Sequence, residues 1–230
     1  MIKRLAVIPA RKNSKRIENK NIYNFYGKPI IWYALNAARK SKLFDTIHVS
    51  TNCEKTIRLS KKFGFPVFFK RPHKLASDNI ALIDVVNYEL EEFKKIDKSF
   101  DVVTLLYPCC PLINHIDLTK ANKIFEKNKK SHPVISVSSY PAPPEWAFKK
   151  DGKFIYPVNK KNIKRRSQDF SKKYFDTGDF IFYQSKIVKK MLKKNYLPKF
   201  IPYEIDRLRS VDIDNIEDLN VSKKLFLIKN

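Results

Sequence analysis

Short continuous apolar runs alternate along the chain with segments whose apolar residues recur every three or four positions. A continuous run is typical of a strand buried on both faces of a sheet, and the recurring spacing is typical of an amphipathic helix. We therefore predict an α/β fold with a mostly parallel sheet and helices on both of its faces. The predicted strands are residues 4–9, 46–50, 66–69, 101–107, 134–138, 175–183 and 200–205.

Helices are predicted between these strands, and their ends are set by proline, glycine and capping residues. Pro29 is expected near the start of the first helix and Gly64 after the end of the second, while Asp78 is expected to cap the third. The predicted helices are 28–40, 54–63, the stretch from Asp78 through Phe93, the stretch around Leu118 to Phe125, 186–193, and the residues after Asp214.

The alternation breaks between residues 140 and 173, where prolines cluster at 141, 143 and 144 ahead of a basic stretch. We interpret residues 140–173 as an excursion from the main sheet, because neither periodicity continues through it. The chain has 230 residues, of which 43% are hydrophobic. We therefore predict a single domain over 1–230 that carries this excursion.

The formal net charge of +24 suggests an anionic partner, with nucleic acid as the first candidate. The lysines, however, are dispersed over the whole chain, so the charge alone favours that partner only weakly. A nucleic-acid-binding domain is the alternative to an enzyme, and residues 66–74 would be its best segment because aromatic and basic side chains mix there. A binding domain should concentrate lysines on one face, whereas an enzyme should gather its functional residues around one cleft.

No apolar stretch approaches the roughly 20 residues that a membrane span needs, and the apolar run at the start is too short for a signal peptide. We therefore expect a cytoplasmic protein with no membrane partner. Three cysteines, two of them adjacent at positions 109 and 110, predict no disulfide framework.

In an open α/β sheet, ligands bind beyond the carboxyl ends of the strands. This rule brings together residues 10–21, 71–78, 107–112 and 210–214. The first segment has neither a Gly-x-Gly-x-x-Gly nor a Gly-Lys-Ser/Thr motif, so side chains would have to hold phosphates there. The candidates are Arg11, Ser14, Lys20 and Asn21. The alternative is a solvated basic loop.

Asp212 and Asp214 are spaced so that, in an extended segment, both carboxylates project from one face. Two neighbouring carboxylates suit an oxygen-loving cation that is shared with phosphates. The alternative is that Asp214 starts the last helix, because Asp214 and Glu217 together resemble a capping box.

Residues 10–21 read A-R-x-x-S-K-x-x-x-x-K-N, and further motifs follow along the chain. These are Gly-Lys-Pro at 27–29, Val-Ser-Thr at 49–51, Arg-Pro-x-x-Leu-Ala-x-Asp at 71–78, Arg-x-Gln-Asp at 166–169, Asp-x-Gly at 176–178 and Asp-Ile-Asp at 212–214. From residue 5 to about 222, the chain resembles the cytidylyltransferases that activate nine-carbon acidic sugars.

The resemblance implies a Rossmann-like nucleotidyltransferase sheet and a reaction with CTP. The C2 hydroxyl of a sugar acid attacks the α-phosphate, and pyrophosphate leaves. The resemblance also implies Mg²⁺ held by Asp212 and Asp214, and a homodimer in which the excursion reaches the partner. The catalytic residues would be Arg11, Lys20, Asp212 and Asp214. The nucleotide-binding residues would be Ala10, Arg11, Ser14, Lys20, Asn21 and Arg71, with Arg71 helping to read the cytosine. Leu82 departs from the family, which has a serine or threonine there that can bond the base.

The sugar is indicated by Tyr107, which stands where relatives that act on sialic and legionaminic acids have a sugar-binding glutamine. The pseudaminic acid enzymes resemble this chain better at that position and at residues 14–21. Candidates for contact with the sugar are Tyr107, Arg165, Arg166, Gln168 and Phe175, the two arginines facing its carboxylate. Alternatively, these arginines belong to a solvated basic run. We predict pseudaminic acid as the substrate, with N-acetylneuraminic acid, legionaminic acid and 3-deoxy-manno-octulosonate as alternatives.

Overall fold

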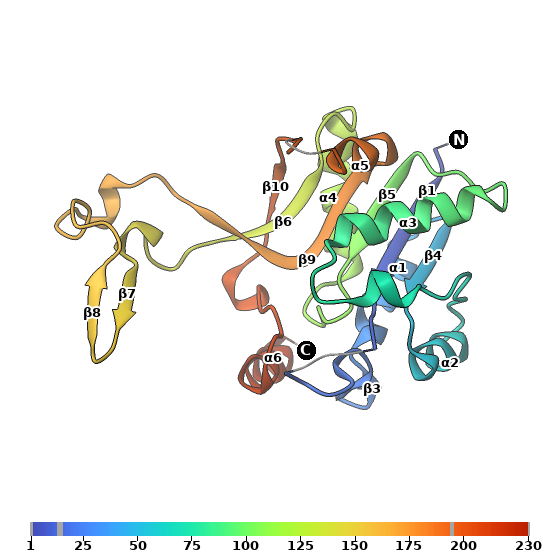
Figure 1. The fold of residues 1–230 in the computed structure, drawn as a ribbon, viewed down its shortest axis with the longest axis horizontal. Coiled ribbons are helices and arrows are strands. Elements are labelled where there is room, and N and C mark those ends of the chain that lie inside the picture. The colour runs from blue at the N-terminus through green and yellow to red at the C-terminus, as the bar shows by residue number, and fades with distance from the viewer. Residues whose placement is uncertain (1, 13–15, 194–195, 230) are drawn as a thin grey trace.

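The computed structural model describes residues 2–12, 16–193 and 196–229. Six strands form one sheet in the order β10-β6-β9-β5-β1-β4 (Figure 1). Strand β9 is antiparallel to its neighbours β5 and β6, and the other pairings are parallel. The mostly parallel α/β sheet is therefore confirmed. The strands are β1 Arg4–Pro9, β4 Thr46–Ser50, β5 Val102–Leu106, β6 Val134–Ser139, β9 Tyr174–Gln184 and β10 Ile201–Glu204.

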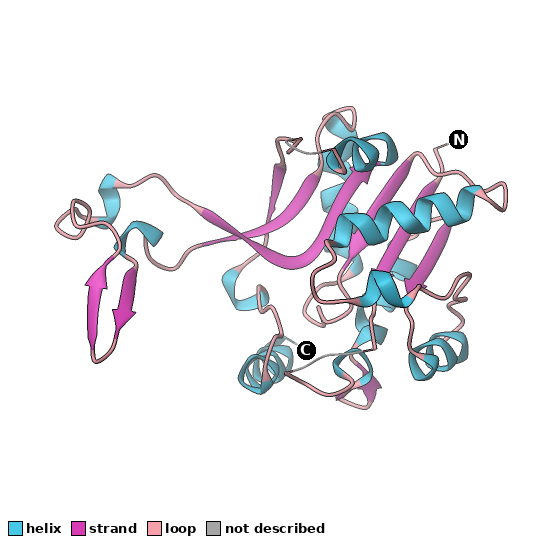
Figure 2. Cartoon of the chain, viewed as in Figure 1, coloured by secondary structure: helices cyan, strands magenta, loops and turns pink. Residues whose placement is uncertain are grey.

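Helices cover both faces of this sheet, as Figure 2 shows. Helices α1 (Ile31–Ser41) and α4 (His115–Lys127) pack in one core cluster, and α3 (Leu82–Lys94) and α5 (Ser185–Met191) pack in the other. Strand β9 contributes side chains to both clusters, because successive side chains of a strand point to opposite faces. Phe182 belongs to the first cluster and Tyr183 to the second. Among the described residues, no helix is both long and apolar enough to cross a membrane.

A third, smaller core lies outside the sheet. The short strands β2 (Asn24–Phe25) and β3 (Lys28–Pro29) form a hairpin, and α6 (Ile216–Lys229) contributes Leu219 to the same cluster as Phe25. Helix α2 (Glu54–Lys62) follows β4. The third core places the segment before α6 beside the first loop of the chain, and Ile213 is one of its fully buried members.

Three local predictions are wrong. Residues 66–69 form no strand, and the only pairing near them is a single bridge between Thr51 and Lys70. The first helix begins at Ile31 rather than Lys28, because Tyr26 and Gly27 take positive φ angles of 45° and 78° and turn the chain into the hairpin. Asp78 does not cap the third helix, which begins at Leu82.

Strand β9 is irregular near its start. Asp176 pairs with Val137 of β6, but Ile181 pairs with Ile135, so the register shifts between them. The extra β9 residues form a bulge around Gly178, which has a φ of +65°. This bulge lies beside the loops that follow β1 and β5, because Gly178 lines the same cavity as Arg11 and Tyr107.

Residues 140–173 leave the sheet between β6 and β9 and project from the main body (Figure 1). They carry a separate hairpin of β7 (Phe148–Asp151) and β8 (Phe154–Pro157). Large apolar side chains are exposed on this excursion, including Phe148, Phe154, Ile155, Tyr156 and Val158.

Candidate functional site

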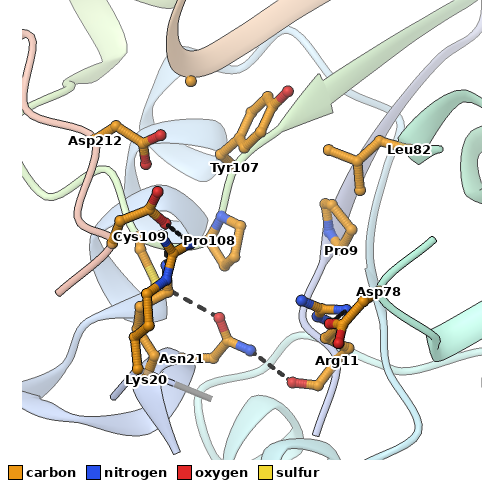
Figure 3. A pocket seen from close by; sticks show the side chains of 13 residues that line it. Pro9, Arg11, Lys20, Asn21, Asp78, Leu82, Tyr107, Pro108, Cys109 and Asp212 are labelled. Atoms are coloured by element: carbon orange, nitrogen blue, oxygen red, sulfur yellow. Dashed lines mark hydrogen bonds and ion pairs between the residues drawn. The ribbon is translucent and has the colours of Figure 1, made fainter. Parts of the chain in front are cut away.

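A cavity of about 500 Å³ opens where β1 and β5 end (Figure 3). Its size lies in the range that small-molecule ligands occupy. The lining residues are Pro9, Arg11, Arg16, Lys20, Asn21, Asp78, Leu82, Tyr107, Pro108, Cys109, Gly178, Asp212 and Asp214. All four segments expected to meet at this edge therefore contribute to the cavity or its flanks.

The loop after β1 is held by contacts of Asn21 and of Arg11. The carbonyl of Arg11 accepts a hydrogen bond from Asn21 Nδ2 at 2.9 Å, and Asn21 Oδ1 accepts one from Cys109 Sγ at 3.5 Å (Figure 3). Arg11 Nη1 lies 2.5 Å from Asp78 Oδ1. Asn21 thus links the loop after β1 to the turn after β5, while the Arg11 side chain stays at the cavity wall. The predicted phosphate ligand Ser14 lies outside the described residues.

Lys20 lies on the other side of the cavity, in a short 3₁₀ turn over Lys20–Ile22. Its Nζ donates to the carbonyl of Ile213 at 2.5 Å and lies 3.5 Å from Asp214 Oδ1. Arg16 reaches the same carboxylate oxygen at 2.8 Å. The structure therefore brings the predicted residues Lys20 and Asp214 into direct contact, together with Arg16, a cation that sequence reasoning did not place in the site.

Asp212 faces the cavity close to the bulge of β9. A Cβ atom added to Gly178 would lie 3.4 Å from Asp212 Cγ, which shows how closely the backbone approaches this carboxylate. The pKa of the Asp212 carboxyl is raised by partial removal from water, and then by the negative charges of Asp214 and Asp176, against the opposing charge of Lys20. Carboxylates that repel one another in this way favour a cation between them.

The last helix is capped without Asp214. The Asp218 carboxylate accepts hydrogen bonds from the backbone N–H groups of Asp214 and Asn215, both at 2.9 Å, and Asn215 Oδ1 accepts one from the N–H of Asp218 at 3.0 Å. The capping box is therefore Asn215 with Asp218, one residue later than the alternative interpretation placed it. The Asp214 carboxylate therefore takes no part in the helix cap, and Asp214 lines the cavity.

The donor set fits Mg²⁺ that shares phosphate oxygens. The described residues contain no group of three or more metal-binding side chains. Mg²⁺, however, is usually bound by one or two carboxylates, with water and substrate phosphates completing its shell. Asp212 and Asp214 supply two carboxylates at the wall of one cavity.

Arg71 is not among the residues that line the cavity. Its side chain is buried, and its Nε donates to Ser50 Oγ at 2.9 Å. Burial lowers the pKa of its guanidinium to about 10. Thus Arg11, Lys20, Asp212 and Asp214 line one cavity, as expected of an enzyme, whereas the buried Arg71 does not line it. Ala10 is also buried, and its N–H donates to the carbonyl of Ser50 at 2.8 Å.

Tyr107 and Leu82 line the same end of the cavity, as Figure 3 shows. Burial raises the pKa of the Tyr107 phenol well above its ordinary value, and the charges of Asp176 and Asp212 raise it further. The phenol is therefore neutral, and Tyr107 lies at the wall of the cavity. Leu82 offers only an apolar surface at this end.

The other predicted sugar contacts do not reach the cavity of their own chain. Arg165, Arg166 and Gln168 lie on the excursion, where Arg165 stacks over Phe170 at 4.5 Å and Arg166 lies 3.4 Å from Asp169. Phe175 packs against Tyr140 at the base of the excursion, with ring centroids 5.3 Å apart.

Sequence reasoning did not single out several lining residues, although Arg16, Asp78, Pro108 and Cys109 lie in segments that it placed at this site; the full set is Pro9, Arg16, Asp78, Pro108, Cys109 and Gly178. Two signals were present. Asp78 ends the Arg-Pro-x-x-Leu-Ala-x-Asp motif, and Gly178 ends the Asp-x-Gly motif. The sequence placed these segments near one another, but which of their residues line the cavity depends on the turns and on the bulge in β9.

Gly178→Ala is expected to reduce turnover at least about tenfold and to cost about 1–2 kcal/mol of stability, because alanine is strained at positive φ. Its methyl group would also lie against the Asp212 carboxylate. Steady-state kinetics and thermal unfolding measure the two effects. Gly152→Ala is the matched control, because its φ is +54° but no atom lies within 4 Å of the added Cβ. Equal activity losses in both variants would contradict a role for the close approach.

An open, mostly parallel α/β sheet with a cavity beyond its strands, lined by cations and carboxylates, is typical of enzymes that handle nucleotides. The model of the cytidylyltransferase family matches residues 5–228, and the chain belongs to that family. It is therefore a nucleotidyltransferase.

The chain is similar to known proteins in sequence and in structure. The pseudaminic acid cytidylyltransferase of Campylobacter jejuni is 32% identical, over 100% of this chain and 98% of that one. The CMP-N,N'-diacetyllegionaminic acid synthase of Legionella pneumophila is 36% identical, over 62% of this chain and 60% of that one. The solved structure of CMP:2-keto-3-deoxy-manno-octonic acid synthetase with CTP has a TM-score of 0.73 at 15% identity, covering 99% of this chain and 100% of that one, which supports the fold.

Proposed function

We propose that the protein transfers a cytidylyl group from CTP to a nonulosonic acid, with pseudaminic acid as the preferred substrate. The observation that carries the proposal is the convergence of Arg11 and Lys20 with Asp212 and Asp214 on one cavity. The similarity to a pseudaminic acid cytidylyltransferase over the full chain supports the choice of sugar.

In this proposal the protein acts mainly by alignment and charge. Arg11 and Lys20 bind the phosphates of CTP, and Asn21 holds the loop that carries Arg11. The C2 hydroxyl of the sugar acid attacks the α-phosphate in line with the departing pyrophosphate. Fixed cations around the phosphates stabilise the charge that moves onto the leaving oxygens. Asp212 and Asp214 would hold Mg²⁺, which would supply positive charge at the phosphate oxygens.

The sugar preference rests on Tyr107. Pseudaminic acid carries a methyl group and acylamino groups where N-acetylneuraminic acid has hydroxyls, and the aromatic face of Tyr107 beside Leu82 suits less polar groups. An unmatched buried hydroxyl costs roughly 1–3 kcal/mol, so kcat/KM should favour pseudaminic acid by about tenfold or more.

Tyr107→Gln is expected to shift this preference toward N-acetylneuraminic acid, because it restores an amide that can bond hydroxyls. Competition kinetics with both sugars measure the shift, and Tyr23→Gln serves as a control on a partly buried aromatic residue that packs against the third core. An unchanged ratio of kcat/KM values would remove Tyr107 from the set of specificity residues.

We also propose that the working unit is a homodimer. Arg165 and Arg166, the candidates for binding the carboxylate of the sugar, lie on the projecting excursion and do not line the cavity of their own chain. The exposed apolar side chains of β7 and β8 suit contact with a second copy. In the dimer, the excursion would bring these arginines to the partner's sugar site.

The decisive experiment measures pyrophosphate release with CTP, UTP and ATP against a panel of the four candidate sugars. We expect release with CTP and pseudaminic acid above every other pair. Release with another sugar would keep the cytidylyltransferase and change the substrate, whereas equal turnover with all three nucleotides would contradict the proposed use of CTP.

A further inference from the structure

Asp212 lies in a segment with few contacts of its own. Neither Val211 nor Asp212 makes a hydrogen bond with the described part of the chain. The position of Asp212 therefore depends on what holds the chain before and after it. After it, Ile213 is fully buried in the third core, and its carbonyl accepts a hydrogen bond from Lys20.

Before Asp212, the chain is held by the side chain of Arg209. Its Nη1 donates to Asp117 Oδ1 at 2.8 Å and its Nη2 donates to Asp117 Oδ2, so the guanidinium binds both oxygens of a buried carboxylate in the first turn of α4. The same Nη2 donates to the carbonyl of Leu112 at 3.1 Å. Leu112 ends the turn after β5, in which residues 107–109 line the cavity. Arg209 thus connects the chain ahead of Asp212 to α4 and to that turn.

The carboxylate that binds Arg209 is itself fixed. Asp117 Oδ2 accepts the N–H of Asn114 at 3.0 Å in the capping box of α4, and Asp117 Oδ1 accepts the hydroxyl of Tyr203 at 3.0 Å. Burial alone would raise the pKa of the Asp117 carboxyl, but the hydrogen bonds from Arg209 and Asn114 outweigh burial and lower it. The pair is therefore charged, and its two parallel hydrogen bonds fix the orientation of the guanidinium as well as its distance.

Only two residues separate Arg209 from Asp212, so the chain between them spans at most about 11 Å. The first of the two, Ser210, continues the 3₁₀ turn over Arg207–Arg209, because its Oγ donates to the carbonyl of Arg207 at 3.0 Å. A fixed Arg209 therefore leaves Asp212 little room to move.

We propose that Arg209 is a positioning residue: through its contacts with Asp117 and Leu112 it fixes the chain that carries Asp212, and with it the place at which this carboxylate would bind Mg²⁺. This inference rests on the proposed function and its metal. The competing explanation is that the pair only stabilises the protein. The two differ in outcome, because a loss of stability lowers the unfolding temperature alone, whereas a displaced Asp212 weakens the binding of the metal.

Arg209→Met tests the proposal, since it removes the guanidinium and keeps an apolar stem. We expect Mn²⁺, a spectroscopic substitute for Mg²⁺, to bind the complex of protein and CTP at least about tenfold more weakly, because loss of a residue that orients a metal ligand typically costs 10- to 100-fold in affinity. Electron paramagnetic resonance of free Mn²⁺ measures this binding without turnover. The Mg²⁺ concentration for half-maximal pyrophosphate release should rise by a similar factor, while the affinity for CTP in excess chelator stays within about threefold.

Arg209→Lys provides a second probe. Lysine keeps a positive charge beside Asp117 but lacks the planar fork that reaches both carboxylate oxygens and the Leu112 carbonyl. It should weaken Mn²⁺ in the same direction as Arg209→Met. It decides the matter if Arg209→Met does not fold, because it leaves no buried carboxylate without a cation.

Arg4→Met is the matched control, because Arg4 also pairs with a carboxylate of α4. Its partner is Glu126, near the other end of that helix, and its Nη1 donates to Asn122 Oδ1 at 2.8 Å. The side chain of Arg4 is 13% exposed, against 17% for Arg209, so the two pairs are similarly shielded from water. Arg4 begins β1, whereas the cavity opens where β1 ends. The variant should lower the unfolding temperature and leave the affinity for Mn²⁺ unchanged.

Wild-type affinity for Mn²⁺ in both Arg209 variants, or an equal loss in Arg4→Met, would overturn the positioning role and leave the proposed function intact. So would a wild-type protein that transfers the cytidylyl group without any metal. A wild-type protein that binds Mn²⁺ together with CTP but turns over none of the sugars would instead contradict the proposed function, while the Mn²⁺ titrations would still decide the role of Arg209. A wild-type protein that does not bind CTP would reject both.

Discussion

Asp212→Asn is expected to lower kcat at least about 100-fold while CTP still binds within a few fold of the wild-type affinity. The amide keeps the volume of the carboxylate but removes the charge that would hold a cation against the phosphates. Asp214→Asn should behave in the same way, because both residues line the cavity. Pyrophosphate release at saturating substrates measures kcat, and equilibrium titration measures the affinity for CTP.

The capping geometry provides the control for these variants. Because Asn215 and Asp218 cap α6, Asp214→Asn should leave the unfolding temperature nearly unchanged. Asn215→Ala should instead cost about 1 kcal/mol of stability and retain turnover. A fully active Asp214→Asn variant, or wild-type activity that persists in excess chelator, would contradict the metal proposal.

Lys20→Met is expected to reduce kcat/KM for CTP at least about 100-fold. Methionine has nearly the length of lysine, so the variant removes a positive charge without opening a large space. Two effects should combine: the phosphates lose a cation, and the Ile213 carbonyl and the Asp214 carboxylate lose the group that contacts both. The segment that carries the two aspartates would then lose one of its ties to the first loop, and the contact between Arg16 and Asp214 would remain.

Long-range attraction must be separated from this local effect, because the whole chain carries a charge of +24. Lys28→Met removes the same charge from the exposed β3 strand outside the cavity, and it should change kcat/KM by less than about twofold. If both variants lost a similar share of kcat/KM at low salt, and neither did at high salt, Lys20 would act only through the net positive charge of the protein.

Sequence reasoning located most of the sheet because buried strands leave continuous apolar runs, such as Val102–Leu106. Residues 66–69 share that composition but pair with no neighbouring strand, and apolar character alone does not reveal a missing partner. The helix cap was ambiguous for a similar reason. Asp214 with Glu217 and Asn215 with Asp218 both fit a capping pattern, and only the hydrogen bonds distinguish them.

For the site, the motif spacing predicted Arg11, Lys20, Asp212 and Asp214 because each follows a strand or precedes a helix at the same sheet edge. It could not predict that Arg71 is buried, since an arginine in a loop is ordinarily exposed. It also could not show that Arg165 and Arg166 lie away from the cavity, because the direction of the excursion depends on how β6 and β9 pair.

That pairing gives the bulge in β9 a further consequence. Side chains alternate between the two faces of a strand. The number of residues in the bulge therefore decides which face of the sheet the preceding side chains of β9 point to. Deleting one residue between Asp176 and Phe180 would turn the side chains of Tyr174, Phe175 and Asp176 to the opposite faces of the sheet. The excursion would then leave β9 in a different direction. The length of this one irregularity therefore sets both the placement of Gly178 against Asp212 and the direction in which the excursion leaves the molecule.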